Sequence, residues 1–324
     1  MALQFCGQKL KEYQIIFHLH ENAIMTFCVL HLIFSLLATL GNLIVIRALW
    51  KASSIPDNLK MLFLSLAFSD FGVGLFAQLT LGVTFAVMLQ TAANGNFNFD
   101  YLCPTVLTVC YALIYLLTCA SFLTITAIAV DRLLAVSLHL RYQELVTSKR
   151  VIITIVSLWF SSGVATCIFS VIPNHNGILV ATIEIVGLLL TTAAYIRVYK
   201  TVIHHQNQIQ CQLHNQLQNS QEMEVIRQRK SALGTLFVYA VFVACFLPNL
   251  CCIMLLAFGR FRVSFLLVNQ ASAFLVLLNS SLNPIVYCWR YREIREIVKT
   301  LVKKLFASES PSGELSSRVA LRME

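Results

Sequence analysis

Residues 22–46 read NAIMTFCVLHLIFSLLATLGNLIVI and contain no Asp, Glu, Lys or Arg. A helix rises about 1.5 Å per residue, so about 20 apolar residues cross the roughly 30 Å hydrocarbon core of a membrane. This stretch is longer than that minimum. It therefore predicts a transmembrane helix.

Five further windows lack these four charged residue types: 71–99, 101–130, 151–183, 231–259 and 263–289. The first of them extends backward through 61–69 with only Asp70 between, and a further apolar stretch at 178–202 contains one acid, Glu184. PNHNG at 173–177 divides the window 151–183 with turn-forming residues. The sequence thus predicts an all-α bundle of seven transmembrane helices, near 23–49, 59–89, 103–134, 151–172, 178–202, 231–257 and 264–288.

The composition excludes several other classes of protein. Of the 324 residues, 58% are hydrophobic and 12% are charged, and the mean hydropathy is +0.74. Soluble domains carry about 25% charged residues, so this chain is neither a cytosolic enzyme nor a disordered protein. Its 11 cysteines are too dilute for a small disulfide scaffold. We therefore expect an integral membrane protein.

The net charge of +9 is distributed unevenly about the predicted helices. On one side lie only Lys9, Lys11, Arg260 and Arg262, whereas the other side holds the remaining 20 of the 24 basic residues. Positive loops stay in the cytoplasm, so we expect an extracellular N-terminus and a cytoplasmic C-terminus in the cell membrane. The asymmetry favours membrane topology over a nucleic-acid partner.

Outside the bundle, the segments differ in composition. YREIREIVKTLVKKLF at 291–306 has apolar residues at helical spacing opposite basic ones, which predicts a helix on the inner, anionic lipid surface. The Gln- and Asn-rich insertion at 204–230 is either flexible or extends the flanking helices. The predicted organisation is an extracellular N-terminus at 1–22, a seven-helix domain at 23–290, a membrane-surface helix at 291–306 and a disordered cytoplasmic tail at 307–324.

Polar groups are costly in hydrocarbon, so each polar motif within a span is a candidate functional site. In chain order the motifs are GN at 41–42, LSLAFSD at 64–70, DRL at 131–133, Trp159, CFLP at 245–248 and NSSLNPIVY at 279–287. This set resembles the rhodopsin-like (class A) G-protein-coupled receptors over residues 23–305, and in detail their melanocortin, adenosine and lipid receptor branch. The resemblance implies a receptor for an extracellular ligand that activates a heterotrimeric G protein, with arrestin and a receptor kinase as further partners.

A carboxylate cluster is expected in the middle of the bundle, formed by Asp70, Ser121, Asn279, Ser280 and Asn283. A lone buried carboxylate is neutralised by a proton or by a cation. The family holds sodium at such a site, and the resemblance implies the same ion here. A purely structural hydrogen-bonded cluster is the alternative. No other cofactor is expected.

At the cytoplasmic mouth, the resemblance implies that Arg132, held by its neighbour Asp131, swings inward on activation. There it would meet Tyr195 and Tyr287 and open a cleft for the G protein. Leu133 replaces the usual tyrosine, and Gln228 stands where some members have an acid. These two departures predict a loosely held resting state with basal activity.

Two prolines are expected to deform the helices, because proline removes a backbone hydrogen bond and clashes with the preceding turn. They are Pro248 in the sixth span and Pro284, which follows Asn283, in the seventh. Phe246 stands where the family usually has tryptophan, and Gly187 stands where the fifth span usually has proline.

The residues expected to line a ligand pocket in the outer half are mostly apolar or mildly polar. They are Tyr111, Ile114, Tyr115, Thr118, Glu184, Asn249, Ile253, Asn269 and Ala273. Ile114 stands where amine receptors carry an aspartate, and the seventh span has no lysine for a retinal Schiff base. A lipid, a small neutral ligand or the buried part of a peptide would fit.

Two features of the outer side remain open. The family disulfide cannot form, because Leu107 replaces its first cysteine and no cysteine lies between Cys167 and Cys211; Cys6 and Cys103 are an alternative pair. Glu184 is either a neutral, structural hydrogen-bonding group, or the anchor of a cationic ligand that replaces the missing aspartate.

Two other functional classes fit the sequence less well. A transporter would usually show inverted repeats, and the sequence has none. A membrane enzyme needs a nucleophile with a base or a metal cluster, and no spacing here assembles one. The sequence therefore predicts a receptor and not an enzyme.

Overall fold

The computed structural model describes residues 2–95, 106–138, 141–171, 176–213, 220–257 and 263–307, and every regular element in these ranges is helical. This confirms the predicted all-α class. The elements are α1 (Ala2–Leu19), α2 (Glu21–Lys51), α3 (Asp57–Gly72), the π-helix η1 (Val73–Gln78), α4 (Leu79–Ala93), α5 (Val106–Leu138), α6 (Tyr142–Leu145), α7 (Ser148–Val171), α8 (Asn176–Leu213), α9 (Ser220–Ala257), α10 (Val263–Arg290) and α11 (Arg292–Ala307).

Within the described residues, seven helical segments are long and apolar enough to cross a membrane, as predicted. The second of them is one continuous helical segment formed by α3, η1 and α4. Large apolar side chains such as Leu36, Phe160 and Leu189 point outward with more than half of their surface exposed. Such a surface suits hydrocarbon and not water.

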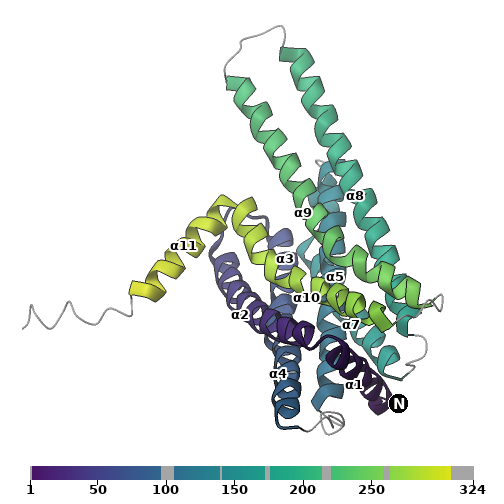
Figure 1. Cartoon of the computed structure of the whole chain (residues 1–324). Helices are drawn as coiled ribbons and strands as arrows, with labels where there is room; N and C mark the ends of the chain where they lie inside the picture. The colour runs from purple at the N-terminus through teal and green to yellow at the C-terminus, as the bar shows by residue number, and fades with distance from the viewer. Residues whose placement is uncertain are drawn as a thin grey trace, which may run out of the picture.

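The Gln- and Asn-rich insertion mainly extends the two helices that flank it. α8 continues to Leu213 and α9 begins at Ser220, so only 214–219 lie outside the described residues. Figure 1 shows this pair projecting together beyond the ends of the other helices. Of the two expectations for this segment, helix extension is the one observed.

The amphipathic segment forms α11, which leaves the bundle at an angle to α10 (Figure 1). Glu293, near its start, accepts hydrogen bonds from the backbone N–H groups of Ser53 at 2.8 Å and Ser54 at 3.0 Å, and from both hydroxyl groups. The Ser54 hydroxyl and the two N–H groups lower the pKa of Glu293 to about 2. α11 is thereby tied to the loop between α2 and α3. The predicted disordered tail at 307–324 lies, apart from Ala307, outside the described residues.

A π-helical segment interrupts the second span, and nothing in the sequence pattern predicted it. Gly74 lies within it against α2, where a Cβ would come within 2.7 Å of the Thr39 backbone nitrogen and 2.8 Å of Ala38 Cβ. The Ser35 hydroxyl donates to the Gly74 carbonyl oxygen at 2.9 Å. The absence of a side chain at Gly74 therefore permits the close contact between α2 and this segment.

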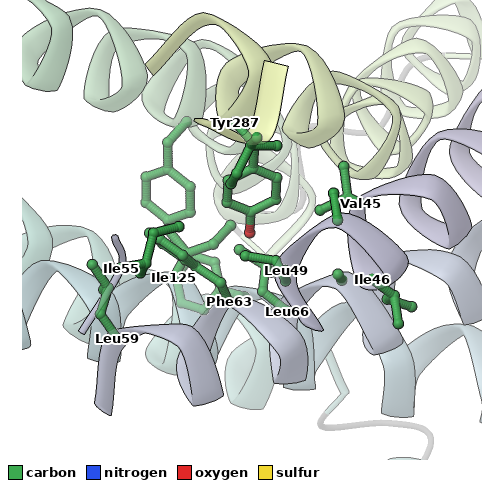
Figure 2. Close-up of a cluster of buried hydrophobic side chains, with 14 of the residues drawn as sticks. Val45, Ile46, Leu49, Ile55, Leu59, Phe63, Leu66, Ile125 and Tyr287 are labelled. Carbon is green, nitrogen blue, oxygen red and sulfur yellow. The ribbon is translucent and has the colours of Figure 1, made fainter. Parts of the chain in front are cut away.

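The core has an outer and an inner part. The inner part joins α2, α3, α5 and α10 through the aliphatic side chains labelled in Figure 2, together with Phe63 and Tyr287, whose ring centroids are 5.0 Å apart. The outer part includes α1, whose Leu10, Tyr13 and Phe17 are buried against the bundle. The predicted N-terminal segment 1–22 is thus a packed helix over most of its length.

Candidate functional site

The mid-bundle carboxylate is held by donors from two other spans. Asp70 is completely buried. Its Oδ1 accepts the Ser121 hydroxyl at 2.8 Å and its Oδ2 accepts the Asn283 amide at 2.6 Å; the Ser280 side chain also hydrogen-bonds it. The structure therefore brings four of the five expected residues together.

Asn279, the fifth expected residue, is also buried, but its amide nitrogen has no hydrogen-bond partner among the described residues. It lines a cavity that Arg132 also lines. The carboxylate oxygens of Asp70 and the hydroxyl oxygens of Ser121 and Ser280 are hard donors of the kind that a small cation prefers. The residues present thus fit a sodium ion, and that assignment stays a prediction.

Near the C-terminal end of α5, Arg132 is paired with its neighbour Asp131. The guanidinium Nε donates to Asp131 Oδ2 at 3.1 Å, and the hydroxyl of Tyr142 donates to Oδ1 at 2.6 Å. Burial and this contact with Asp131 raise the pKa of Tyr142 to about 12, so the hydroxyl remains a donor. Both oxygens of Asp131 are therefore occupied, and α6 contributes to holding the pair.

A cavity of about 80 Å³ lies between Arg132 and the tyrosines that the resemblance assigns to it. Arg132, Tyr195 and Tyr287 all line it, as do Asn279 and Asn283. The Tyr287 hydroxyl is buried and has no hydrogen-bond partner in the described part of the chain. The geometry provides both an unsatisfied acceptor and the space that an inward movement of the arginine needs.

Above this cavity, an aromatic stack joins α5 to α9. Phe122 stacks on Phe242 with ring centroids 5.4 Å apart, and Phe246 lies 4.8 Å from both. At Gly187 on α8, a Cβ would lie 2.3 Å from Phe122 Cε1, which is too close for any side chain. Pro248 lies inside α9 two residues beyond Phe246, and Pro284 lies inside α10.

The outer half contains a second cavity, of about 70 Å³. Glu184, only 6% exposed, lines it together with Tyr115, Thr118 and Phe246. The Asn249 amide donates to Glu184 Oε1 at 2.9 Å, whereas Oε2 has no partner among the described residues. This pairing across α8 and α9 matches the expectation that Glu184 hydrogen-bonds the third or sixth span.

The other residues expected in the ligand pocket lie elsewhere. The hydroxyl of Tyr111 donates to that of Tyr13 on α1 at 2.8 Å, and Ile114 packs against the same outer core. The remaining three, Ile253, Asn269 and Ala273, are half-buried on α9 and α10 and do not line the cavity. Their part in ligand binding stays a prediction.

Several residues that line the outer cavity were not among those expected from the sequence. Val180 lies one turn from Glu184, so helical spacing from this acid would have identified it, whereas Ile183 is the direct neighbour of Glu184 in the chain. Ala165 and Thr166 on α7 carry no such signal. Cys6 and Cys103, the alternative disulfide pair, and the Gln228 side chain lie outside the described residues.

Comparison with known proteins gives consistent matches over almost the whole bundle. Residues 41–178 and 175–287 match the family described as 7 transmembrane receptor (rhodopsin family). Among curated relatives, adenosine receptor A2b of Gallus gallus is 24% identical, over 86% of this chain and 89% of that receptor. Adenosine receptor A2b of Mus musculus is 24% identical over 91% and 96%, and adenosine receptor A2a of Cavia porcellus is 25% identical over 90% and 80%.

Proposed function

Because this chain belongs to the rhodopsin family of seven-transmembrane receptors, we propose that it transmits ligand binding in its outer half to a G protein through the cytoplasmic ends of α5, α8, α9 and α10. Membership makes it a multi-pass G-protein-coupled receptor of the cell membrane and not an enzyme. An extracellular ligand and a heterotrimeric G protein are its partners. The resemblance inferred from the sequence is confirmed at this level.

The observation that carries the proposal is the arrangement around the inner cavity. Arg132 on α5, Tyr195 on α8 and Tyr287 on α10 line one cavity of about 80 Å³. In the resting arrangement the guanidinium is neutralised by Asp131. Release of that pair would let Arg132 donate to the Tyr287 hydroxyl, which lacks a partner among the described residues, and would clear the cytoplasmic mouth for the G protein.

The direct test is nucleotide exchange by a purified G protein on reconstituted receptor. We expect Arg132→Ala to remove exchange while surface expression and ligand binding remain. Arg150→Ala is the matched control, because this cytoplasmic arginine donates to the Leu145 carbonyl oxygen at 2.7 Å and does not line the inner cavity. Normal exchange by a well-expressed Arg132→Ala receptor would contradict the mechanism.

We further propose that the N-terminus is extracellular and the C-terminus cytoplasmic, as the charge asymmetry indicates. α11 then lies on the inner leaflet, with Ile294 buried against the bundle and Lys299, Lys303 and Lys304 exposed toward anionic lipid. Arrestin and a receptor kinase would bind at this same face. A C-terminal epitope should be stained by antibody only after permeabilisation; staining of intact cells would exclude this orientation.

The names of the relatives make adenosine the first ligand to assay, and a response to it would be read by the same nucleotide exchange. The sodium ion predicted at Asp70 would act as an allosteric partner that favours the resting state.

A further inference from the structure

We propose that the outer cavity binds an apolar molecule with a single amine group, that Glu184 holds this group as an ammonium ion, and that the molecule enters from the hydrocarbon between α7 and α8. The proposal rests on the proposed receptor function and specifies the chemistry of its ligand. It is carried by the unsatisfied Glu184, by the apolar wall around it and by the sparse contact between α7 and α8.

Only one of the two carboxyl oxygens of Glu184 has a hydrogen-bond partner in the described structure. Oε1 is satisfied by Asn249, and Asn249 is thereby fixed as a donor to this carboxyl group. Oε2 is buried without a partner in the described structure, and a buried polar atom without a partner costs about 1–3 kcal/mol. A ligand that donates a hydrogen bond at Oε2 would remove that cost.

The other described side chains that line the cavity do not offer Glu184 a positive charge, and most of them are apolar. No Lys, Arg or His is among the described side chains that line it. The Thr118 hydroxyl already donates to the Ile114 carbonyl oxygen at 2.6 Å. Phe122, Ile183 and Val276 contribute apolar surface. One acid in an apolar cavity of about 70 Å³ selects a slender apolar body with one cationic end.

The outer end of α5 packs against α1. Tyr13 on α1 accepts the hydrogen bond of Tyr111, and its ring lies edge-on to Phe85 with centroids 5.0 Å apart. Tyr115, one turn further along α5, lines the cavity. α1 therefore covers α5 one turn away from the cavity.

The side facing the lipid is less tightly packed. α7 packs mainly on α5 and α3 and touches α8 very little. Across that gap, Ala165 and Thr166 of α7 and Leu179 and Val180 of α8 line the cavity. Ile178, 60% exposed on the outer surface, continues this apolar face toward the lipid. A molecule dissolved in the hydrocarbon can reach Glu184 by this route.

Entry from the lipid also avoids moving a charged ligand through hydrocarbon. An amine crosses hydrocarbon as its neutral free base, because an ion there costs at least a few kcal/mol. On arrival the Glu184 carboxylic acid transfers its proton to the amine nitrogen. The O–H bond breaks, an N–H bond forms, and a carboxylate–ammonium pair results without a net charge having crossed the membrane.

The test uses the full-length receptor in lipid nanodiscs and 4-phenylbutylamine as the probe, with empty nanodiscs subtracted. We expect saturable binding that Glu184→Gln weakens at least tenfold, or about 1.4 kcal/mol, since glutamine keeps the volume but neither holds a charge nor gives up a proton. The neutral analogue 4-phenylbutan-1-ol should be insensitive to Glu184→Gln. Thr182→Val on α8 is the matched control, because its hydroxyl donates to the Ile178 carbonyl oxygen at 2.7 Å and Thr182 does not line the cavity. Equal amine binding by wild type and Glu184→Gln would overturn the proposal.

The route is tested with the trimethylammonium analogue of the same probe, which cannot become neutral. Entry from the lipid predicts much slower association for this analogue, and faster association of 4-phenylbutylamine as the pH rises. Equal rates for both probes would refute entry through the lipid.

These measurements do not depend on the G protein. Amine binding lost in Glu184→Gln but kept in Arg132→Ala would support the cavity assignment even where exchange fails. A response to adenosine that is unaffected by Glu184→Gln would count against an amine as the ligand.

Discussion

The inner and outer halves of the bundle hold their polar groups in different ways. In the inner half, Asp70 accepts hydrogen bonds from other spans at both oxygens, and Asn42 donates to the Ala38 and Ser280 carbonyl oxygens. In the outer half, His31 is completely buried between Phe85 and Phe274, and within the described structure neither ring nitrogen has a hydrogen-bond partner. In the inner half, donors from two spans thus meet at one carboxylate, whereas the hydrogen bonds described in the outer half, Asn249 to Glu184 and Tyr111 to Tyr13, are single pairs set in apolar packing.

This contrast matters because a polar network suits a change of conformation, whereas an apolar half suits the binding of a molecule. A polar network has a small number of discrete arrangements, so breaking one bond favours another arrangement. An apolar outer half with an unsatisfied Glu184 offers a place where a bound molecule completes the packing. Substitutions in each half should therefore have effects of different kinds and sizes.

The largest effect is expected at Asp70. If the inner network holds a sodium ion, Asp70→Asn should abolish the sodium sensitivity of agonist binding, because the only carboxylate of the cluster is then gone. Radioligand binding across a sodium titration measures this. Asp57→Asn, at the start of α3, is the control and should behave as wild type. Undiminished sodium dependence in Asp70→Asn would place the ion elsewhere.

In the outer half, Asn249→Leu should destabilise the receptor by about 1–3 kcal/mol, because it leaves both Glu184 oxygens buried without the amide donor. The double variant Glu184→Leu/Asn249→Leu should recover most of that loss, since both polar groups are then removed together. Unfolding of the receptor in mixed micelles measures the free energies. No recovery in the double variant would mean that the pair is not the source of the loss.

At the outer mouth, Tyr13→Phe should cost about 1 kcal/mol, which is typical of a single hydrogen bond. The cycle formed with Tyr111→Phe and the double variant should show coupling, because the two hydroxyl groups are 2.8 Å apart. Additive losses would show that α1 is held by apolar contacts alone.

The smallest effect is expected at the exposed hydrogen bonds of Glu293 on α11 to Ser53 and Ser54, here called the clamp. Because the pKa of Glu293 is held at about 2, below its ordinary value of 4.5, the clamp is fully formed at neutral pH. We expect Glu293→Gln to lower the melting temperature slightly at pH 7, and this difference should shrink as the pH falls from 4.5 toward 2. Glu296→Gln is the control, because Glu296 pairs only with Arg295 and Lys299 in the described structure. A difference that persists at the lowest pH would contradict the clamp.

The sequence predicts the inner half better than the outer half, for a physical reason. Spans are recognised by the absence of charge, and their polar residues stand out because hydrocarbon makes them costly. Asp70, Ser121 and Asn283 were therefore expected to meet, and they do. The seven spans and α11 were predicted in the same way.

The features that the sequence did not predict depend on packing without a polar marker. α1 is held by Leu10, Ile16 and Phe17, and their apolar character alone does not reveal which helix they contact. η1 follows from the close approach of Gly74 to α2, which involves residues far apart in the chain. Asn279 has the right type and spacing for the carboxylate cluster but turns toward the inner cavity, and only the surrounding packing decides this.

The contact of Gly187 with Phe122 limits how this receptor can change through its evolution. Because a Cβ at Gly187 would overlap the Phe122 ring, no residue with a side chain is accessible there while Phe122 remains. A smaller residue at position 122 must come first, and only then can position 187 vary, including toward the proline usual in the family. The order of the two substitutions is therefore constrained, and Gly187 is expected to be replaced only in descendants in which Phe122 has already been replaced.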